Sequence, residues 1–246
     1  MCASLGKCAV IVVAGGKGTR MGGELPKQFL PLLGRPVLMH TIDALRNALP
    51  EADIVLALAP EEHSRWQGLC RRHAFVSPTV VNGGRERFHS VQCALASVPS
   101  DVELIGVHDG VRPLVAAEVV AAAFAEAAIS GAAIPVVDVV ETLRRLSPDA
   151  CGPDRKDKGR SPSGEVVPRS QYRLVQTPQV FRAEWLRVAY AQPYREGFTD
   201  DASVVEAAGY PVTLVSGNRE NIKITLPADL LIAEALLTAR HTPKNP

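Results

Sequence analysis

The sequence predicts a doubly wound α/β fold, a mostly parallel sheet with helices on both faces. Two observations favour this class: apolar runs of strand length alternate with amphipathic stretches of helix length, and glycine-rich turns follow several of the runs. We see no internal repeat and no domain linker, so we expect one domain over residues 1–246. In such sheets ligands bind beyond the carboxyl ends of the strands, and the residues that follow each strand are therefore the candidates for function.

The predicted elements follow one another in simple alternation. Strands are expected at residues 9–14, 53–59, 79–81, 102–110, 132–137 and 210–217. Helices are expected at residues 36–49, 61–73, 82–98 (after an initial turn), 116–131 and 227–240. Pro36 suits a first helical turn, and Gly131 is a C-terminal stop. Asp200 and Asp201 are typical of a helix start.

Composition excludes several classes of function. The net charge of +1 gives no global field for nucleic acid or membrane, and 5% aromatic residues are too few for a nucleic-acid stacking surface. The five cysteines are scattered without a C-x-x-C pair, which argues against a disulfide framework or a zinc site. The first apolar run is too short for a signal peptide, and no run could span a membrane. We therefore expect a cytoplasmic protein.

The stretch AVIVVAGGKGTRMGGELPKQFL, residues 9–30, is a strand followed by a glycine cluster and two cations. It lacks the lysine and hydroxyl spacing of a Walker loop. It also has Met21 where a dinucleotide fingerprint needs its third glycine, and no acidic ribose ligand follows. Gly15, Gly16 and Gly18 nevertheless allow backbone N–H groups to face an anion, and Arg20 and Lys27 add charge. A tight structural turn with solvated cations is the alternative.

Charged residues near the ends of two later strands extend this prediction. Asp109 ends the strand at residues 102–110, and one carboxylate beside phosphate oxygens is a usual way to hold magnesium. Its alternative role is to cap the turn before Pro113. Arg112 has the fork geometry that suits a phosphate, and Lys223, in an expected apolar strand, must reach an anion or water. His108 is interpreted as a packed residue without a catalytic role.

These residues lie in motifs that carry a family resemblance. The stretch AGGKGTRMGGELPKQFLPLLGRPVL resembles the signature of nucleotidyltransferases that activate small phosphorylated compounds. With NGGRERFHSVQCAL, VHDGVRPLV, QTPQVF, FTDDASVVEAAGYPVTLVSGNRENIKIT and PADLLIAE, the chain resembles the 2-C-methyl-D-erythritol 4-phosphate cytidylyltransferase family of the non-mevalonate isoprenoid pathway. The resemblance implies a Rossmann-like nucleotidyltransferase fold. It also implies transfer of the cytidylyl group of CTP to 2-C-methyl-D-erythritol 4-phosphate, with release of pyrophosphate and with magnesium as cofactor.

Two other functions stay open at this point. A ribitol-5-phosphate cytidylyltransferase would share the glycine loop and the HDG-x-R motif. A nucleotide-binding regulatory module without turnover is the alternative of a different class. Some members of the family carry a fused cyclase domain after this one, and we expect that second activity to be absent from a chain that ends in HTPKNP.

The resemblance also assigns roles to residues. Those implied to bind the nucleotide are Ala14, Gly15, Gly16, Gly18, Gly84, Arg85, Ser90 and Thr199. Those implied to bind the second substrate are Asp109, Arg112, Thr142, Arg169, Thr177, Lys223 and Thr225, with Asp109 also holding the metal. Those implied to act in catalysis are Arg20, Lys27, Arg169 and Lys223. Ser90 is equally a helix-terminal hydroxyl, Thr225 a helix cap, and the role of Arg85 is open.

Residues 147–168 are rich in proline, glycine and charge and lack any hydrophobic period. In the family a protruding β-arm occupies this place, joins two subunits and delivers a threonine and an arginine into the neighbour's site. The resemblance places the arm at about residues 142–172, with Thr142 and Arg169 in those two roles, and implies a homodimer. The flanks at 141–146 and 165–175 have alternating strand character, and the middle, residues 151–164, is expected to be a mobile surface insertion.

Overall fold

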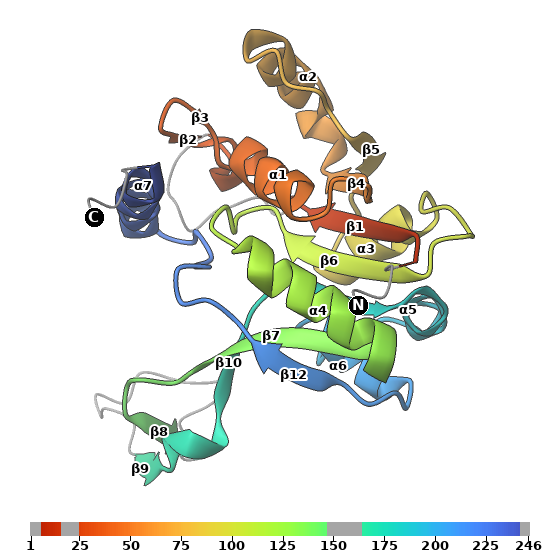
Figure 1. Ribbon diagram of the computed structural model, residues 1–246, viewed down its shortest axis with the longest axis vertical. Coiled ribbons are helices and arrows are strands. Elements are labelled where there is room, and N and C mark those ends of the chain that lie inside the picture. Colours follow the sequence, from red (N-terminus) through yellow and green to blue (C-terminus); the bar gives the residue numbers. More distant parts are fainter. Residues whose placement is uncertain (1–5, 16–24, 147–163, 242–246) are drawn as a thin grey trace, which may run out of the picture.

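The computed structural model describes residues 6–15, 25–146 and 164–241, and its centre is a single large sheet (Figure 1). The sheet has eight strands in the order β10-β7-β11-β6-β1-β4-β5, with β12 against β7. These strands are β1 (Cys8–Val13), β4 (Asp53–Leu58), β5 (Thr79–Asn82), β6 (Leu104–Asp109), β7 (Ala132–Asp138), β10 (Arg173–Val175), β11 (Gln179–Arg182) and β12 (Thr213–Ser216). The predicted α/β class is confirmed.

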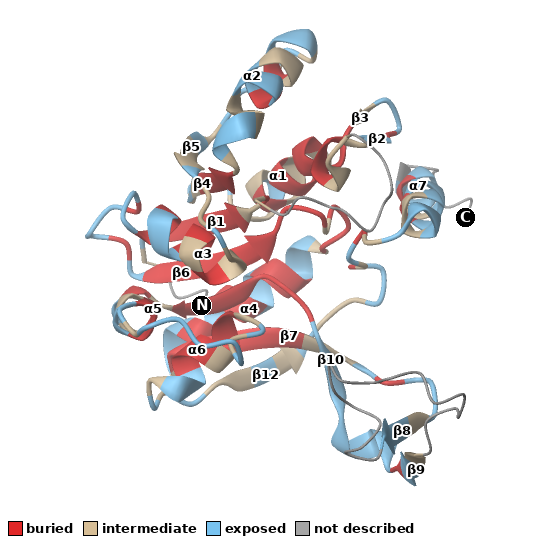
Figure 2. Ribbon diagram, turned by 180° about the vertical axis from the view of Figure 1, so that it is seen from behind, coloured by how far each residue is buried: buried red, intermediate tan, exposed pale blue. Residues whose placement is uncertain are grey.

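Helices cover both faces of the sheet. The helices are α1 (Val37–Ala48), α2 (His63–Arg72), α3 (Arg87–Leu95), α4 (Ala117–Ser130), α5 (Ala183–Tyr190), α6 (Asp201–Ala207) and α7 (Pro227–His241). Figure 1 shows α1 and α4 on one face, and the view from behind shows α3, α5 and α6 on the other (Figure 2). Within β1, Val10 and Val12 pack into the first layer while Ala9 and Ile11 pack into the second. This double burial explains why β1 is apolar at every position.

The sheet has a parallel part, formed by β5, β4, β1 and β6, and a mixed part, formed by β11, β7, β10 and β12. β1 is parallel to β4 and to β6, β4 is parallel to β5, and β7 is parallel to β12. β11 enters between β6 and β7 and is antiparallel to both, and β10 is antiparallel to β7. The chain order reverses at β1, since β4 and β6 lie on its two sides. A crevice at the carboxyl ends of the strands is expected at such a reversal.

The ends of several helices follow the local chemistry of the sequence. Pro36 is the N-cap of α1, and Gly131 ends α4 in the left-handed conformation with φ 94°. Asp200 caps α6: its carboxylate accepts the Ser203 N–H at 2.9 Å, and the Ser203 hydroxyl accepts the Asp200 N–H in return. The prediction that Asp200 and Asp201 start a helix is confirmed.

Some elements were not predicted from the hydrophobic pattern. These are the short hairpin of β2 (Pro31–Leu32) and β3 (Arg35–Pro36), the strand β11, and the helix α5. Each is either very short or interrupted, so neither period develops over enough residues to be recognised. Conversely, the segment 221–225, expected as a strand, is irregular: Asn221 and Ile222 make backbone bonds to nearby residues, and the N–H of Ile224 donates to the carbonyl of Val111 at 2.9 Å.

The hairpin of β8 (Leu143–Leu146) and β9 (Gly164–Val167) projects away from the sheet, and we call the segment from Thr142 to Tyr172 the arm (Figure 1). The alternating flanks therefore form strands, as predicted. Residues 147–163, which include most of the expected insertion, lie outside the described residues. In the described part of the chain, no helix is long and apolar enough to cross a membrane.

Candidate active site

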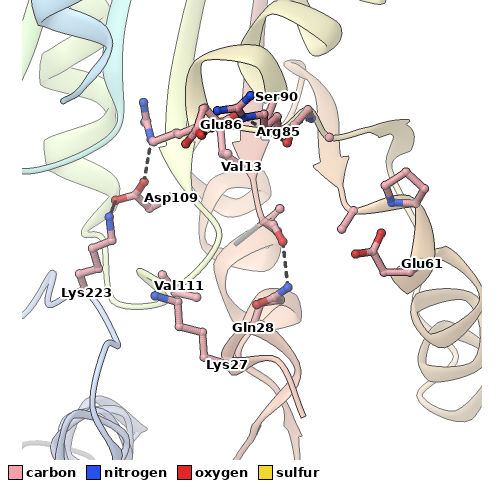
Figure 3. Close-up of a pocket in the computed structure, with 17 residues that line it drawn as sticks. Val13, Lys27, Gln28, Glu61, Arg85, Glu86, Ser90, Asp109, Val111 and Lys223 are labelled. Carbon is pink, nitrogen blue, oxygen red and sulfur yellow. Dashed lines mark hydrogen bonds and ion pairs between the residues drawn. The ribbon is translucent and has the colours of Figure 1, made fainter. Parts of the chain in front are cut away.

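A pocket of about 540 Å³ opens at the carboxyl ends of β1, β4, β5 and β6 (Figure 3). Val13, Ala14 and Gly15 line it from β1, and the turn at 83–87 lines it after β5. Asp109 ends β6 in the pocket wall, while Lys27 and Lys223 come from the segments that follow β1 and β12. The volume is within the range of small-molecule sites, and the position agrees with the rule for open α/β sheets.

One end of the pocket is held by a short 3-10 turn, η2 (Lys27–Phe29). Gln28 is buried, and its Nε2 donates to the carbonyl oxygen of Ala14 at 2.8 Å. This bond ties η2 to the end of β1, so the backbone that carries Lys27 has a fixed place at the pocket. Burial raises the pKa of Asp229 in α7, but the hydrogen bonds to Leu226 and Thr225 and the nearby charge of Lys27 outweigh burial and lower that pKa.

The opposite end is a tight turn between β5 and α3. The Ser90 hydroxyl accepts the N–H of Gly84 at 3.1 Å and donates to the carbonyl of Glu86 at 3.1 Å. A side chain at position 84 would put its Cβ 2.3 Å from the Cβ of His89, so only glycine fits. The Ser90 hydroxyl therefore braces the turn before α3, and Ser90 also lines the pocket, while its contact with a nucleotide stays a prediction.

Three cations converge on Asp109. Nζ of Lys223 and Nε of Arg112 lie 3.0 and 3.1 Å from Oδ2, and Nε of Arg87 lies 3.4 Å from Oδ1. Burial alone would raise the pKa of Asp109, but Arg87, Lys223 and Arg112 outweigh it and hold that pKa far below its usual value. The carboxylate is therefore ionised at any physiological pH, inside a wall that carries a positive excess.

Arg87 is a site residue that the sequence analysis missed. Its Nη1 and Nη2 bind the two carboxylate oxygens of Asp201 at 2.9 and 2.6 Å, and the hydroxyl of Tyr190 donates to Asp201 Oδ1 at 2.6 Å. Arg87 stands in the motif NGGRERF and Asp201 in FTDDAS, so both were within quoted motifs. Their partnership joins residues 114 positions apart, which no local pattern reveals.

Behind the wall, His108 and Thr177 form a buried network. Nε2 of His108 is 3.1 Å from the carbonyl oxygen of Arg112 and must carry the proton, because a carbonyl only accepts. Nδ1 therefore accepts from the Thr177 hydroxyl at 3.0 Å, and that hydroxyl accepts the Asp109 N–H at 3.1 Å. Burial is the main cause that lowers the pKa of His108 to about 4. The prediction of a packed, non-catalytic histidine is consistent with this geometry.

Most of the predicted site residues within the described chain meet at the pocket. Those that line it are Ala14, Gly15, Lys27, Gly84, Arg85, Ser90, Asp109 and Lys223. Arg112 is not among the lining residues, but its Nε donates to Asp109, which is, and its Nη1 donates to the carbonyl of Asn221 at 2.8 Å. The side chain of Arg85 is 89% exposed at the rim and lies beside Glu86. Gly16, Gly18 and Arg20 lie outside the described residues.

The other predicted residues do not line the pocket in this structure. The Thr225 hydroxyl donates to Asp229 at 2.8 Å at the start of α7, so it takes part in a helix-terminal network, although the cap itself is the aspartate. Thr199 is exposed just before α6. Thr142 and Arg169 are exposed on the arm, where Arg169 donates to the carbonyl of Val140.

The arrangement suits a polyanion next to a nucleoside. Lys27 and Lys223 bring positive charge to one end of the pocket, and backbone groups of the turn at Gly84 edge the other. Among the described residues no group of three His, Cys, Asp or Glu side chains is placed to hold a metal by itself. A metal here would need ligands from the bound anion.

Comparison with known proteins gives the family. The family model described as 2-C-methyl-D-erythritol 4-phosphate cytidylyltransferase matches residues 8–239. A cytidylyltransferase of that description from Bacteroides thetaiotaomicron is 53% identical over 94% of this chain and 100% of its own length. One from Bacteroides fragilis is 51% identical, over 92% and 98%. The crystal structure of the Thermus thermophilus enzyme superposes with a TM-score of 0.72 at 35% identity, covering 94% of this chain and 99% of that one. The chain belongs to the 2-C-methyl-D-erythritol 4-phosphate cytidylyltransferase family.

Proposed function

We propose that the pocket at the end of β1 is where this chain transfers the cytidylyl group of CTP to 2-C-methyl-D-erythritol 4-phosphate. The products are 4-diphosphocytidyl-2-C-methyl-D-erythritol and pyrophosphate, and the reaction serves isoprenoid precursor biosynthesis. Membership of the family supports the reaction. The observation that carries the site is the convergence of Arg87, Arg112 and Lys223 on Asp109 in a pocket that Lys27 also enters.

CTP is proposed to lie along the pocket with its base toward the turn at Gly84 and Ser90. Ala14 and Gly15 then face the nucleoside, with Gly16, Gly18 and Thr199 as further proposed contacts. The triphosphate points toward Lys27, with Arg20 as the second cation of the same loop. The carbonyl and N–H groups of a tight turn suit a base edge, and the cations suit phosphate oxygens.

The chemical step forms a bond between a phosphate oxygen of methylerythritol phosphate and the α-phosphorus of CTP, and it breaks the bond to the β-phosphate bridging oxygen. The attacking phosphate has a second pKa near 6 and is mostly ionised at neutral pH, so no general base is required. Negative charge grows on the phosphoryl oxygens and on pyrophosphate. Lys27, Lys223 and Arg20 are proposed to stabilise that charge, which is the main source of catalysis in such reactions.

Magnesium is proposed to bind at Asp109 together with the triphosphate. The donor set fits in part: a single carboxylate with substrate oxygens and water is usual for magnesium. Both oxygens of Asp109 already face cations, however, so the ammonium group of Lys223 would have to move away from Oδ2 before a metal could bind there. Its side chain is 41% exposed and can turn toward the phosphates. When bound there, magnesium would neutralise phosphate charge.

The second substrate is proposed to bind near Lys223 and Arg112, with a second copy of the chain completing the site. Thr142 and Arg169 are exposed on the arm and do not line the pocket of their own chain. We infer a homodimer in which the arm of one subunit brings these two residues to the other. The hydroxyl of Thr177 accepts the N–H of Asp109 behind the pocket wall, and the hydroxyl of Thr225 donates to Asp229 at the start of α7. A cytoplasmic location is also proposed, because an exposed free thiol at Cys93 suits a reducing compartment.

Release of pyrophosphate tests this proposal directly. Purified protein is mixed with CTP, magnesium and one acceptor at a time: methylerythritol phosphate, ribitol 5-phosphate, or glycerol 3-phosphate as a control. We expect rapid release with the first acceptor alone and loss of activity in EDTA that added magnesium restores. Equal rates with ribitol 5-phosphate would overturn the substrate assignment. Full activity in EDTA would overturn the proposed requirement for magnesium.

A further inference from the structure

Four side chains from four elements form a continuous line of contacts from the pocket wall into the core. Asp109 ends β6, Arg87 begins α3, Asp201 begins α6 and Tyr190 ends α5. Nε of Arg87 is 3.4 Å from Asp109 Oδ1, while Nη1 and Nη2 are 2.9 and 2.6 Å from the oxygens of Asp201. Tyr190 donates its hydroxyl to Asp201 Oδ1 at 2.6 Å. We call Arg87, Asp201 and Tyr190 the Arg87 clamp.

The clamp is anchored in the core, unlike the contact that Lys223 makes with the pocket wall. Asp201 is 0% exposed and Tyr190 is 2% exposed, whereas the side chain of Lys223 is 41% exposed. Gln179 holds the start of α6 from the sheet, since it accepts the Ala202 N–H at 2.8 Å and donates to Asp200 at 2.8 Å. Two charge-assisted bonds to a carboxylate fixed in this way immobilise the guanidinium of Arg87.

The two oxygens of Asp109 are held differently. Among the cations that the structure describes, Arg87 faces Oδ1, whereas Arg112 and Lys223 both face Oδ2. The terminal torsion of an aspartate is broad, so a carboxylate held at only one oxygen can rotate. If Lys223 turns toward incoming phosphates, the orientation of Asp109 depends on Arg87 and Arg112.

We propose that Arg87 is a positioning residue for the cytidylyl transfer. Clamped by Asp201 and Tyr190, it keeps Oδ1 of Asp109 in place, so that Oδ2 faces the pocket when the triphosphate arrives. The inference rests on the proposed role of Asp109 in that reaction. A buried arginine–carboxylate pair adds little net stability, because desolvation offsets most of its attraction. Orientation of the pocket wall is therefore the effect to measure.

Arginine is required for this role, since its planar fork can meet Asp201 with two nitrogens and Asp109 with the third. A lysine would keep the charge and lose the second contact. We expect Arg87→Lys to lower kcat/KM by about 10- to 100-fold, as is typical when the group that orients a catalytic ligand is replaced. Tyr190→Phe, which removes only the bond to Asp201, should lower the same parameter by a smaller factor.

The matched control is Arg187→Lys. Arg187 lies on α5 and also anchors two elements, because its guanidinium donates to the carbonyls of Leu95 and Val98 at 3.0 and 2.9 Å. Within the described residues, none of the carbonyls to which Arg187 donates belongs to a residue that lines the pocket. We expect this variant to keep the wild-type kcat/KM even if its Tm falls. Equal losses of activity in both lysine variants would show a general packing effect and would overturn the inference.

A double-mutant cycle with Asp109→Asn separates positioning from packing. CTP affinity in magnesium is measured by calorimetry, which needs no turnover, and kcat is measured alongside. If Arg87 acts through Asp109, adding Arg87→Lys to Asp109→Asn should cause no further loss. If the double variant instead shows the product of the two single-variant fold-losses, the inference is overturned while the proposed function stays intact. An Asp109→Asn variant with wild-type affinity and rate would instead remove the proposed role of Asp109, and the inference with it. If Arg87→Lys fails to fold, Tyr190→Phe completes the same cycle.

Discussion

At the residue scale, Lys27 is the cation whose proposed role is in catalysis more than in stability. It is carried by η2, whose place depends on Gln28 and on the buried Phe29 rather than on the lysine itself. Its charge faces the end of the pocket where the triphosphate is proposed to bind. An interaction that strengthens as phosphate charge grows lowers the barrier, and its loss reduces the rate more than the affinity.

Lys27→Ala should therefore lower kcat by about 10²- to 10³-fold, the usual cost of one electrostatic contact to a transition state. Far-ultraviolet circular dichroism and the Tm should stay close to those of the wild type. Steady-state kinetics with CTP and methylerythritol phosphate measure the effect. A kcat within a few-fold of the wild type would contradict the assignment. Arg20→Ala is expected to behave alike.

His108 makes stability depend on pH. Its pKa is lowered by burial to about 4, against about 6.5 in the unfolded chain, so the unfolded state binds the proton first. Stability is fully present above the unfolded value and is lost as the pH falls toward the folded one. Between pH 7 and pH 5, protonation of this group in the unfolded chain lowers the free energy of unfolding by about 2 kcal/mol.

Urea unfolding at both pH values measures this cost. A His108→Gln variant, which keeps one donor and one acceptor, should lose about 2 kcal/mol less than the wild type over the same interval. Asp109 adds almost nothing to the slope between pH 7 and pH 5, because its carboxyl is ionised over that interval both in the folded state, where the pKa is lowered, and in the unfolded state, where the pKa is about 3.9. An identical pH dependence in the variant and the wild type would rule out His108 as the source.

At the scale of the element, the turn between β5 and α3 tolerates no side chain at position 84. At Gly84 a Cβ would lie 2.3 Å from the Cβ of His89 and 2.8 Å from its backbone carbonyl carbon. Gly84→Ala must push α3 away from the turn, and overpacking of this kind costs about 1–3 kcal/mol. Because Ser90 also bonds to Gly84, the affinity for CTP should fall as well.

Gly68 in α2 is the matched control, since a Cβ there meets nothing within 4 Å. Gly68→Ala should leave CTP affinity unchanged and stabilise the protein by about 0.5–1 kcal/mol, because alanine favours helix over glycine. Thermal melts and CTP titrations of both variants give the comparison. Unchanged CTP binding in Gly84→Ala would show that this turn does not contact the nucleotide.

At the scale of the whole molecule, the arm is proposed to complete the active site of a second subunit. The arm projects from the sheet and presents Arg169 and Thr142 to solvent, so these side chains are poorly placed for their own pocket (Figure 1). In the proposed homodimer, two-fold symmetry would let each subunit supply these two side chains to the pocket of the other. Arg169→Ala should then cripple turnover with little change in CTP affinity.

Mixing two inactive variants, Arg169→Ala and Lys27→Ala, tests the shared site. In a mixed dimer both changes fall in one site and the other site is intact. Half of the dimers are mixed after statistical exchange, so up to about a quarter of the wild-type activity per subunit should return. The control is each variant alone after the same treatment. Absence of recovery with subunit exchange verified, or an active monomer, would contradict the shared site.

Local chemistry alone determined much of this protein. The buried strand β1, the stop at Gly131 and the acids at the start of α6 follow from patterns within a few residues. The rule that ligands bind at strand ends then led to Lys27 and Asp109 without any coordinates, and the family resemblance added Ala14 and Gly84. Such features are predictable because one helix or strand contains all the interactions that define them.

Only the tertiary structure decided how the charges are paired. Arg87 meets Asp201 across 114 positions of the chain, and Lys223 reaches Asp109 from an irregular segment that the sequence suggested as a strand. It likewise decided that His108 is neutral, because its burial comes from several elements at once. The free energy of a buried charge depends on every neighbour that replaces water, and those neighbours are chosen by the packing of the whole chain.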